Sequence, residues 1–338
     1  SKREFRNYLK EIYKKRGEHM RIGIDIGGMT IKIGLVDDAY KIVARKVIPT
    51  NADTEDAKKT VRRMAEALKE LLKEYGIKDK DCASLGIACP GTVDGTSGTV
   101  VYSNNIHWED VPIVAWLREH ISLPVYLAND ADAAALAETL AGAAKGRKNA
   151  VLVTLGTGVG GGVIIDGHIF TGPLRGGCEL GHMVIERNGR PCTCGRCGCF
   201  ETYASASALM QDAKRAAEEH PESLMNELVD GDRASIDGRI IFDAEKKGDP
   251  TAKEVVLQYE KDLSVGLANI INIFRPEAVI LGGGVSAQKE YLTKPLSEMV
   301  KKECFGGSLG EIAPIVTSQL ENDAGIIGAA YLGKSWEI

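Results

Sequence analysis

The sequence lacks an excess of positive charge, a long apolar run and a Walker A phosphate-binding motif. Its 338 residues include 42 lysines and arginines against 47 aspartates and glutamates, which gives a net charge of −5. A general nucleic-acid surface needs the opposite balance, and no apolar stretch is long enough to span a membrane. Without a G-x-x-x-x-G-K-S/T sequence, a P-loop is excluded. A hydrophobic content of 44% is sufficient for a large core, and the length predicts two domains. From the charge and the lack of an apolar run, we expect a cytoplasmic protein with no nucleic-acid or membrane partner.

A disulfide framework is also missing. Four of the eight cysteines (Cys82, Cys89, Cys178 and Cys304) are scattered, and the other four fall within PCTCGRCGCF, residues 191–200. No secretory leader opens the sequence, so we expect reducing surroundings. There, a cysteine cluster is more often a metal site than a disulfide knot. The residues alone leave open a four-cysteine site, a site that includes a histidine, or no metal.

The first twenty residues differ from the rest. They carry seven basic and three acidic side chains, and Phe5, Leu9, Ile12 and Tyr13 recur at helical spacing, which indicates a short amphipathic helix. We interpret residues 1–20 as an N-terminal extension or an expression remnant, because a core strand follows directly.

The remaining sequence has two halves that open alike, with a strand, a glycine turn and a second strand at 21–37 and again at 149–170. In the first half we expect an amphipathic helix over 54–75 stopped by Gly76, strands in 83–91 and 123–130, and an alanine-rich helix over 131–146. In the second half we expect a long helix over 254–274, a strand in 277–286 and a small-residue helix over 324–333. The pattern predicts an α/β fold.

Gly156, Gly158 and Gly161 spell G-x-G-x-x-G, yet a dinucleotide fingerprint requires a helix immediately afterwards. Here GVIIDGHIF follows, which is typical of a strand. Two glycine hairpins remain, and with Asp25 and Lys32 beside the first they favour phosphate binding over plain tight turns. Asp25 is a candidate to hold a hydrated Mg²⁺.

Five segments in order carry a resemblance: DIGGMTIKIG (25–34), LANDADAAALAE (127–138), LGTGVGGG (155–162), ELGH (179–182) and CTCGRCGCFE (192–201). Residues 21–338 resemble the ROK family of repressors and sugar kinases, within it the bacterial glucokinase branch. The resemblance implies an actin-like ATPase (ribonuclease H-like) fold with two α/β domains around a deep cleft. It implies a small domain of residues 21–132 plus 325–338, and a large domain of residues 133–324. Homodimers or homotetramers are expected on the same ground.

The resemblance also implies the site. Asp130 is the expected catalytic base, although an Asp at a strand–helix junction could instead cap the helix. The expected sugar-binding residues are Gly91, Asn105, Asn129, Asp130, Glu179, His182 and Glu201. The expected ATP-binding residues are Asp25, Gly27, Gly28, Thr30, Lys32, Thr157, Gly158, Gly282, Gly283 and Gly284. The family usually has Thr where Met29 stands, so Thr30 is the hydroxyl left for phosphate contact.

For the cysteine loop, residues 182–199, the resemblance implies zinc bound by His182, Cys192, Cys194 and Cys199, with Cys197 at a variable position. A closed Cys₃His site has no place for water, so the zinc should be structural and should brace the sugar-binding residues.

The implied function is ATP- and Mg²⁺-dependent phosphorylation of a hexose, glucose to glucose 6-phosphate. Fructose, allose, N-acetylglucosamine and N-acetylmannosamine are alternative acceptors. A second class is a sugar-sensing transcriptional regulator, against which we count the 24 residues before Asp25, too few for a winged helix. A third is a sugar-binding protein without catalysis, which should lack the base.

Overall fold

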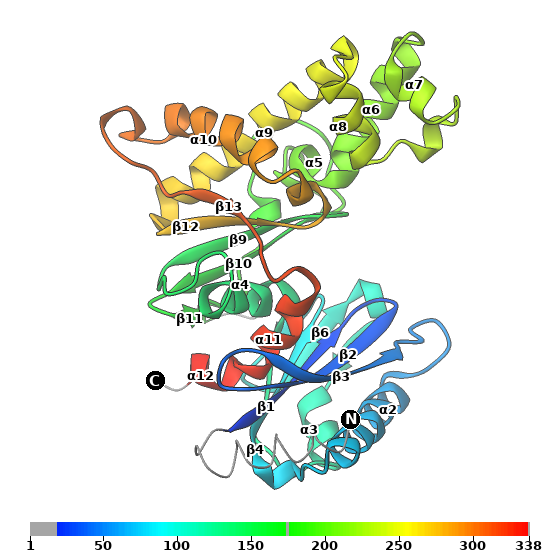
Figure 1. The fold of residues 1–338 in the computed structure, drawn as a ribbon, viewed down its shortest axis with the longest axis vertical. Helices are drawn as coiled ribbons and strands as arrows, with labels where there is room; N and C mark the ends of the chain where they lie inside the picture. Colours follow the sequence, from blue (N-terminus) through cyan, green and yellow to red (C-terminus); the bar gives the residue numbers. More distant parts are fainter. Residues whose placement is uncertain (1–18, 174–175, 337–338) are drawn as a thin grey trace. The chain divides into compact units, whose positions relative to one another are not determined.

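A computed structural model describes residues 19–173 and 176–336 (Figure 1). The amphipathic helix expected around Phe5 to Tyr13 lies outside the described residues. The chain divides into two compact units, which are described separately. The first unit contains the chain up to Lys148, Gly162–Cys178 and the chain from Leu320 on; the second contains Asn149–Gly161 and Glu179–Gln319. The domain boundaries implied by the resemblance stay a prediction.

The first unit is built on a five-stranded sheet of order β3-β2-β1-β4-β8. Its strands are β1 (Met20–Ile26), β2 (Thr30–Val36), β3 (Ile42–Pro49), β4 (Cys82–Cys89) and β8 (Val125–Asn129). β2 runs antiparallel to β1, whereas β4 is parallel to both β1 and β8. Ile22, Ile24 and Ile26 alternate along β1 and are at most 1% exposed, so this period-2 face forms the core, as alternation predicts. The first glycine hairpin is confirmed.

The first unit also contains a three-stranded sheet of β5 (Thr92–Asp94), β6 (Thr99–Ser103) and β7 (Trp108–Val111). Its helices are α2 (Ala57–Tyr75), α3 (Ile113–Arg118), α4 (Asp130–Leu140), α11 (Ala324–Ala330) and α12 (Leu332–Trp336). Its 3₁₀ turns are η1 (Asp79–Asp81), η2 (Asn104–Ile106) and η7 (Glu321–Asp323). The side chain of Asp56 caps α2, and Gly76 ends it in the left-handed conformation (φ 66°). The helix and its glycine stop are therefore confirmed.

The alanine-rich helix is shorter than predicted. α4 ends at Leu140, whereas the sequence predicted a helix to residue 146. Ala141 leaves the helical conformation (φ −138°), and the buried Glu138 carboxylate accepts hydrogen bonds from the backbone N–H groups of Ala143 and Leu320. A side chain that competes for backbone donors ends the helix early, and propensity alone does not reveal this.

Helix α11 packs on β1, β4 and α4 of the same unit (Figure 1). The approach is close: a Cβ built on Gly23 would lie 1.9 Å from the Ile326 carbonyl oxygen, and one on Gly86 would lie 1.8 Å from that of Ala329. Two neighbouring strands therefore need glycine where the helix backbone crosses them.

The second sheet has the order β11-β10-β9-β12-β13. Its strands are β9 (Ala150–Leu155), β10 (Val159–Ile165), β11 (His168–Ile169), β12 (Ala278–Gly282) and β13 (Ile315–Thr317). The division between the units falls within β10. A strand, and not a helix, follows the G-x-G-x-x-G sequence, so the rejection of a dinucleotide fingerprint is confirmed.

The helices of the second unit are α5 (Glu201–Ala204), α6 (Ala206–Glu219), α7 (Leu224–Leu228), α8 (Gly238–Lys246), α9 (Pro250–Phe274), α10 (Glu290–Glu303) and the 3₁₀ turns η3 (Leu180–His182), η4 (Arg233–Ser235), η5 (Gly284–Gln288) and η6 (Gly307–Leu309). The predicted long helix begins at Pro250 and not at residue 254, because the Asp249 side chain caps it and proline suits the first turn. Among the described helices, none is long and apolar enough to cross a membrane.

Replacing Gly86 by alanine should destabilise the first unit. The added methyl would collide with the Ala329 carbonyl, and overpacking of this kind costs about 1–3 kcal/mol or more. Urea unfolding measures the loss. Gly238→Ala is the matched control, because nothing lies within 4 Å of a Cβ there. Equal unfolding midpoints for both variants and the parent would contradict the packing.

Candidate active site and metal centre

Asp130 lies where β8 passes into α4. The helix is capped by its neighbour Asn129, whose Oδ1 accepts the Ala131 N–H at 2.8 Å and whose amide donates to the Gly91 carbonyl at 2.9 Å. Asn129, not Asp130, is therefore the N-cap. The half-buried Asp130 carboxylate also accepts the Ala131 N–H, through Oδ1 at 2.9 Å. Because Asn129 already caps the helix, Asp130 is not required as the N-cap.

The surroundings of Asp130 disfavour its charge. Burial raises the pKa of Asp130, and the nearby Asp25 carboxylate raises it further, although the Ala131 N–H opposes both. The direction of the pKa shift is upward, which makes the carboxylate a stronger proton acceptor than an exposed aspartate.

Asp25 stands on the same edge of the sheet. It pairs with Ala88 of β4, which pairs with Ala128 of β8 just before the Asp130 junction. Lys32, opposite Asp25 on β2, places Nζ 3.1 Å from its Oδ2. Parallel strands end together at one edge, so the sheet gathers these polar side chains where α/β proteins bind ligands.

The first glycine turn joins β1 to β2. The Gly27 N–H donates to the Thr30 carbonyl at 2.9 Å, and the Met29 carbonyl accepts from the Thr50 N–H at 2.9 Å. The Met29 side chain is 86% exposed, so this residue contributes only its backbone to the fold of the turn. Thr30 is exposed at the start of β2 and has the hydroxyl that Met29 lacks.

The expected sugar residues of the first unit lie around two loops. Asn129 and Gly91 are hydrogen-bonded, whereas Asn105 is exposed in η2, where its carbonyl oxygen would lie 3.5 Å from a Cβ on Gly28. A cavity of about 270 Å³ borders Asn129. The sequence analysis missed Asp132, a buried residue that lines this cavity with Asn129. The second aspartate of the AND-A-D run was the available signal.

The second glycine turn, between β9 and β10, presents an exposed Thr157. The Glu201 carboxylate reaches this turn and accepts the Val159 N–H at 3.0 Å. At the end of β12, a Cβ on Gly283 would lie 2.4 Å from the Leu155 carbonyl, whereas nothing lies within 4 Å of one on Gly284. A Cβ on Gly282 would make only ordinary contacts. Gly283 thus serves packing, and Gly284 leaves open space.

Four side chains of the second unit converge into one cluster: His182, Cys192, Cys194 and Cys199. Their ligand atoms all lie within 4.8 Å of one another, with His182 Nδ1 3.7 Å from Cys192 Sγ and Cys194 Sγ 3.6 Å from Cys199 Sγ. Zinc–sulfur bonds of about 2.3 Å and zinc–nitrogen bonds of about 2.0 Å in a tetrahedron separate ligand atoms by about 3.5–3.8 Å. The cluster therefore fits a zinc ion, and Cys197 is not part of it.

Local hydrogen bonds stabilise the metal loop. The Cys192 N–H donates to the Arg196 carbonyl at 2.8 Å, and Val184 and Cys199 form an isolated β-bridge. Gly198 adopts a positive φ of 81°, which glycine allows without strain. Burial, together with hydrogen bonds to the neighbouring thiols, raises the pKa of Cys199 to about 12. Zinc binding would therefore release a proton from this thiol.

Arg190, which the sequence analysis missed, fastens the loop to the helices. Its guanidinium stacks 4.6 Å from the Tyr203 ring centroid, donates to the Thr202 carbonyl at 3.1 Å and pairs with Asp212 at 2.9 Å. These partners are distant in sequence, so no local pattern indicates them.

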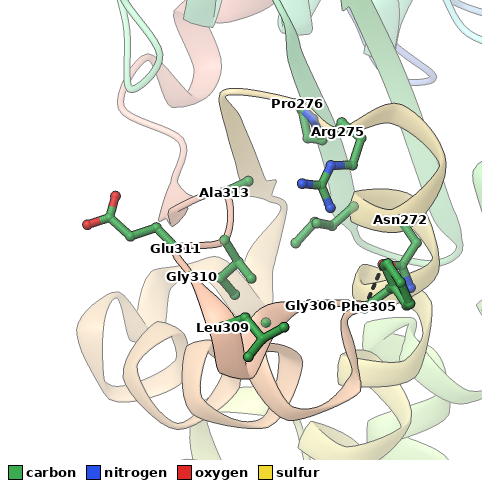
Figure 2. Close-up of a pocket in the computed structure, with 12 residues that line it drawn as sticks. Asn272, Arg275, Pro276, Phe305, Gly306, Leu309, Gly310, Glu311 and Ala313 are labelled. Atoms are coloured by element: carbon green, nitrogen blue, oxygen red, sulfur yellow. Dashed lines mark hydrogen bonds between the residues drawn. The ribbon is translucent and has the colours of Figure 1, made fainter.

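A larger cavity of about 730 Å³ lies away from all predicted site residues. Figure 2 shows Asn272, Arg275 and Phe305 around it, with the Phe305 N–H donating to Asn272 Oδ1 at 3.0 Å. Pro276, at the start of the loop into β12, also lines it, whereas Gly283 and Gly284 follow the opposite end of that strand. Cavity size alone does not locate the chemistry here.

Solved structures define the class. Similar structures include a ROK family glucokinase from Streptomyces griseus in complex with glucose and AMPPNP (34% identity, 93% of this chain and 98% of that chain, TM-score 0.76) and a ROK hexokinase from Thermus thermophilus (34%, 93% and 97%, 0.78). The fold is therefore the actin-like ATPase fold of sugar kinases, and the predicted fold class is confirmed.

The ROK family model matches residues 21–335. A glucokinase from Thermotoga maritima is 38% identical over 315 residues, 93% of this chain and 96% of that protein. This chain belongs to the ROK family, as the five motifs predicted.

Loss of a single cluster ligand should release the metal. We expect about one zinc per chain in the purified protein, and Cys199→Ser should lose it and melt more than about 5 °C lower if the site contributes a few kcal/mol. Metal analysis and thermal melting measure both effects.

The matched control is Cys197→Ser, because Cys197 lies two residues before Cys199 in the same loop but is not part of the cluster. It should keep zinc and melting temperature. Loss of zinc from Cys197→Ser as well as from Cys199→Ser would favour the four-cysteine alternative, and retention of zinc by Cys199→Ser would contradict both ligand sets.

Proposed function

We propose that this protein is an ATP-dependent hexose kinase that converts glucose to glucose 6-phosphate, with Asp130 as the general base. The observation that carries the proposal is the Asp130 carboxylate, half-buried at the carboxyl end of β8 beside Asn129, which is the N-cap of α4. Relatives named glucokinase at 36% and 38% identity, each aligned over more than nine-tenths of the chain, support the reaction and the sugar.

Asp130 supplies the proton acceptor. As the sugar hydroxyl attacks the terminal phosphorus of ATP, its proton passes to the Asp130 carboxylate, while the bond from phosphorus to the leaving ADP oxygen breaks. The raised pKa of Asp130 favours this transfer. A binding protein without catalysis would not need such a group.

The glycine turns would receive the phosphates of ATP. Gly28, Thr157 and Gly158 would offer backbone N–H groups, and Lys32 a cation paired with Asp25. Gly27 would shape the first turn, since its N–H donates to the Thr30 carbonyl. Thr30 supplies the hydroxyl missing at Met29, and Gly282, Gly283 and Gly284 are assigned to the adenosine. Asp25 would hold a hydrated Mg²⁺, which neutralises phosphate charge when bound.

From the resemblance to the family, the residues assigned to the sugar are Gly91, Asn105, Asn129, Glu179, His182 and Glu201. His182 turns Nδ1 to the thiol of Cys192, so Nε2 is the ring nitrogen available to a sugar hydroxyl. A bound zinc would fix the tautomer and orientation of this ring. The zinc has a structural task, and His182, Cys192, Cys194 and Cys199 would hold it.

Assembly and location are further parts of the proposal. A homodimer or homotetramer in the cytoplasm is expected from the resemblance to the family. Fructose, allose, N-acetylglucosamine and N-acetylmannosamine are the alternative acceptors, and a regulator is the alternative class.

A sugar panel tests the reaction. ADP release should be fastest with glucose, and Asp130→Asn should lower kcat by about 10²- to 10⁴-fold because the base is lost. No turnover with any hexose would refute the kinase, and full activity in Asp130→Asn would refute the base. A stability measurement is the control for this comparison. Because the pKa of Asp130 is raised in the folded protein, the ionised carboxylate destabilises the native state at higher pH. The Asp130→Asn variant should therefore be at least as stable as the parent at pH 7.

The pH profile gives a second test. Because burial and Asp25 raise the pKa of Asp130, kcat/KM should fall as pH decreases through a single ionisation above the usual aspartate value of about 4. The residual activity of Asp130→Asn should lack this acid limb. An acid limb that persists unchanged in the variant would assign the ionisation to another group.

A further inference from the structure

Glu201 follows the metal loop in the chain, and its carboxylate contacts a glycine turn. Glu201 begins α5, immediately beyond the Cys199 end of the metal loop, and its Oε2 accepts the Val159 N–H at 3.0 Å. Val159 is the residue after Gly158, where β10 begins. All of these residues belong to the second unit, so the contact lies within one compact body.

The same carboxylate fills the space that a side chain at position 158 would need. A Cβ built there would lie 2.2 Å from Glu201 Oε2, yet Gly158 is not among the glycines with positive φ. The backbone would accept an alanine, and only the carboxylate excludes it. A second tie supports the arrangement, because the Ala206 N–H donates to the Gly156 carbonyl at 2.9 Å. The start of α5 and α6 thus holds the turn at two points.

We propose that Glu201 is a positioning residue that couples sugar binding to ATP binding, because it holds the phosphate turn as well as the sugar. This inference rests on the proposed function of the two sites. Oε2 is committed to Val159, and within the described part of the chain Oε1 remains to accept a sugar hydroxyl. A sugar that immobilises the carboxylate also immobilises the turn, so ATP then binds to a turn that is already ordered.

Linkage makes the coupling reciprocal. In the wild-type protein, saturating glucose should lower the Kd of a non-hydrolysable ATP analogue about five- to tenfold, and the analogue should lower the Kd of glucose by the same factor. Calorimetry measures both. Equal affinities with and without the second ligand would overturn the coupling.

Gly158→Ala tests the coupling from the phosphate side. Its methyl should displace the Glu201 carboxylate, so the Kd of glucose measured without nucleotide should rise about fivefold or more. Gly156→Ala is the matched control in the same turn, since nothing lies within 4 Å of a Cβ there. Its glucose Kd should stay within about twofold of wild type. Unchanged glucose affinity in Gly158→Ala would overturn the inference.

Glu201→Ala and Glu201→Gln test it from the sugar side. Without any sugar, Glu201→Ala should bind the ATP analogue about fivefold or more weakly, because the turn loses its anchor. Glu201→Gln keeps an oxygen for the Val159 N–H and should recover most of this affinity. A residue that only contacts sugar would leave analogue binding unchanged in both variants, which would overturn the proposal.

The outcomes separate the two hypotheses. If the wild-type protein phosphorylates glucose but the crossed effects are absent, the coupling alone is wrong. If it neither binds nor phosphorylates any hexose, the proposed function fails and the coupling fails with it. Thermal melting of each variant distinguishes lost affinity from lost folding.

Discussion

The hydrogen bond from the Val159 N–H to Glu201 is the interaction on which the proposed site of the second unit depends. It joins the segment that follows the metal loop to the turn that follows β9. Because an exposed turn with glycine at two positions has many conformations, an anchor at its end is needed to aim its N–H groups at a ligand. A charged acceptor suits this task, since its hydrogen bonds are stronger than neutral ones.

The metal cluster and the proposed base, Asp130, have different roles in the proposed mechanism. The four ligand atoms approach closely enough to enclose an ion and leave no position for water. The cluster can therefore hold Glu201 and His182 in place but cannot activate a reactant itself. Asp130 lies in the first unit, where burial and Asp25 alter its proton affinity. The metal cluster and the proposed base thus lie in different units.

Close backbone packing gives Asp25 its surroundings. Helix α11, almost at the end of the chain, crosses β1 and β4 at glycines, and a Cβ on Gly325 would lie 2.5 Å from Asp25 Cγ. The glycine keeps space beside the carboxylate that the proposed Mg²⁺ requires. A segment three hundred residues further along the chain therefore determines the space around Asp25. The small residues of 324–333 allow this close approach.

The sequence by itself determined the elements and the residue types of the site. Alternating apolar residues predicted β1, Gly76 marked the end of α2, and five motifs identified the family, because each of these depends on neighbours in the chain. The start of α2 was predicted at residue 54, whereas the Asp56 cap places it at Ala57. Only the tertiary structure decided which side chains meet. Four features join residues through space: the early end of α4 caused by the Glu138 hydrogen bonds, the capping of that helix by Asn129, the attachment of the metal loop by Arg190, and the contact of Glu201 with Gly158. No local period encodes such contacts, since they arise from burial and hydrogen bonding between distant segments.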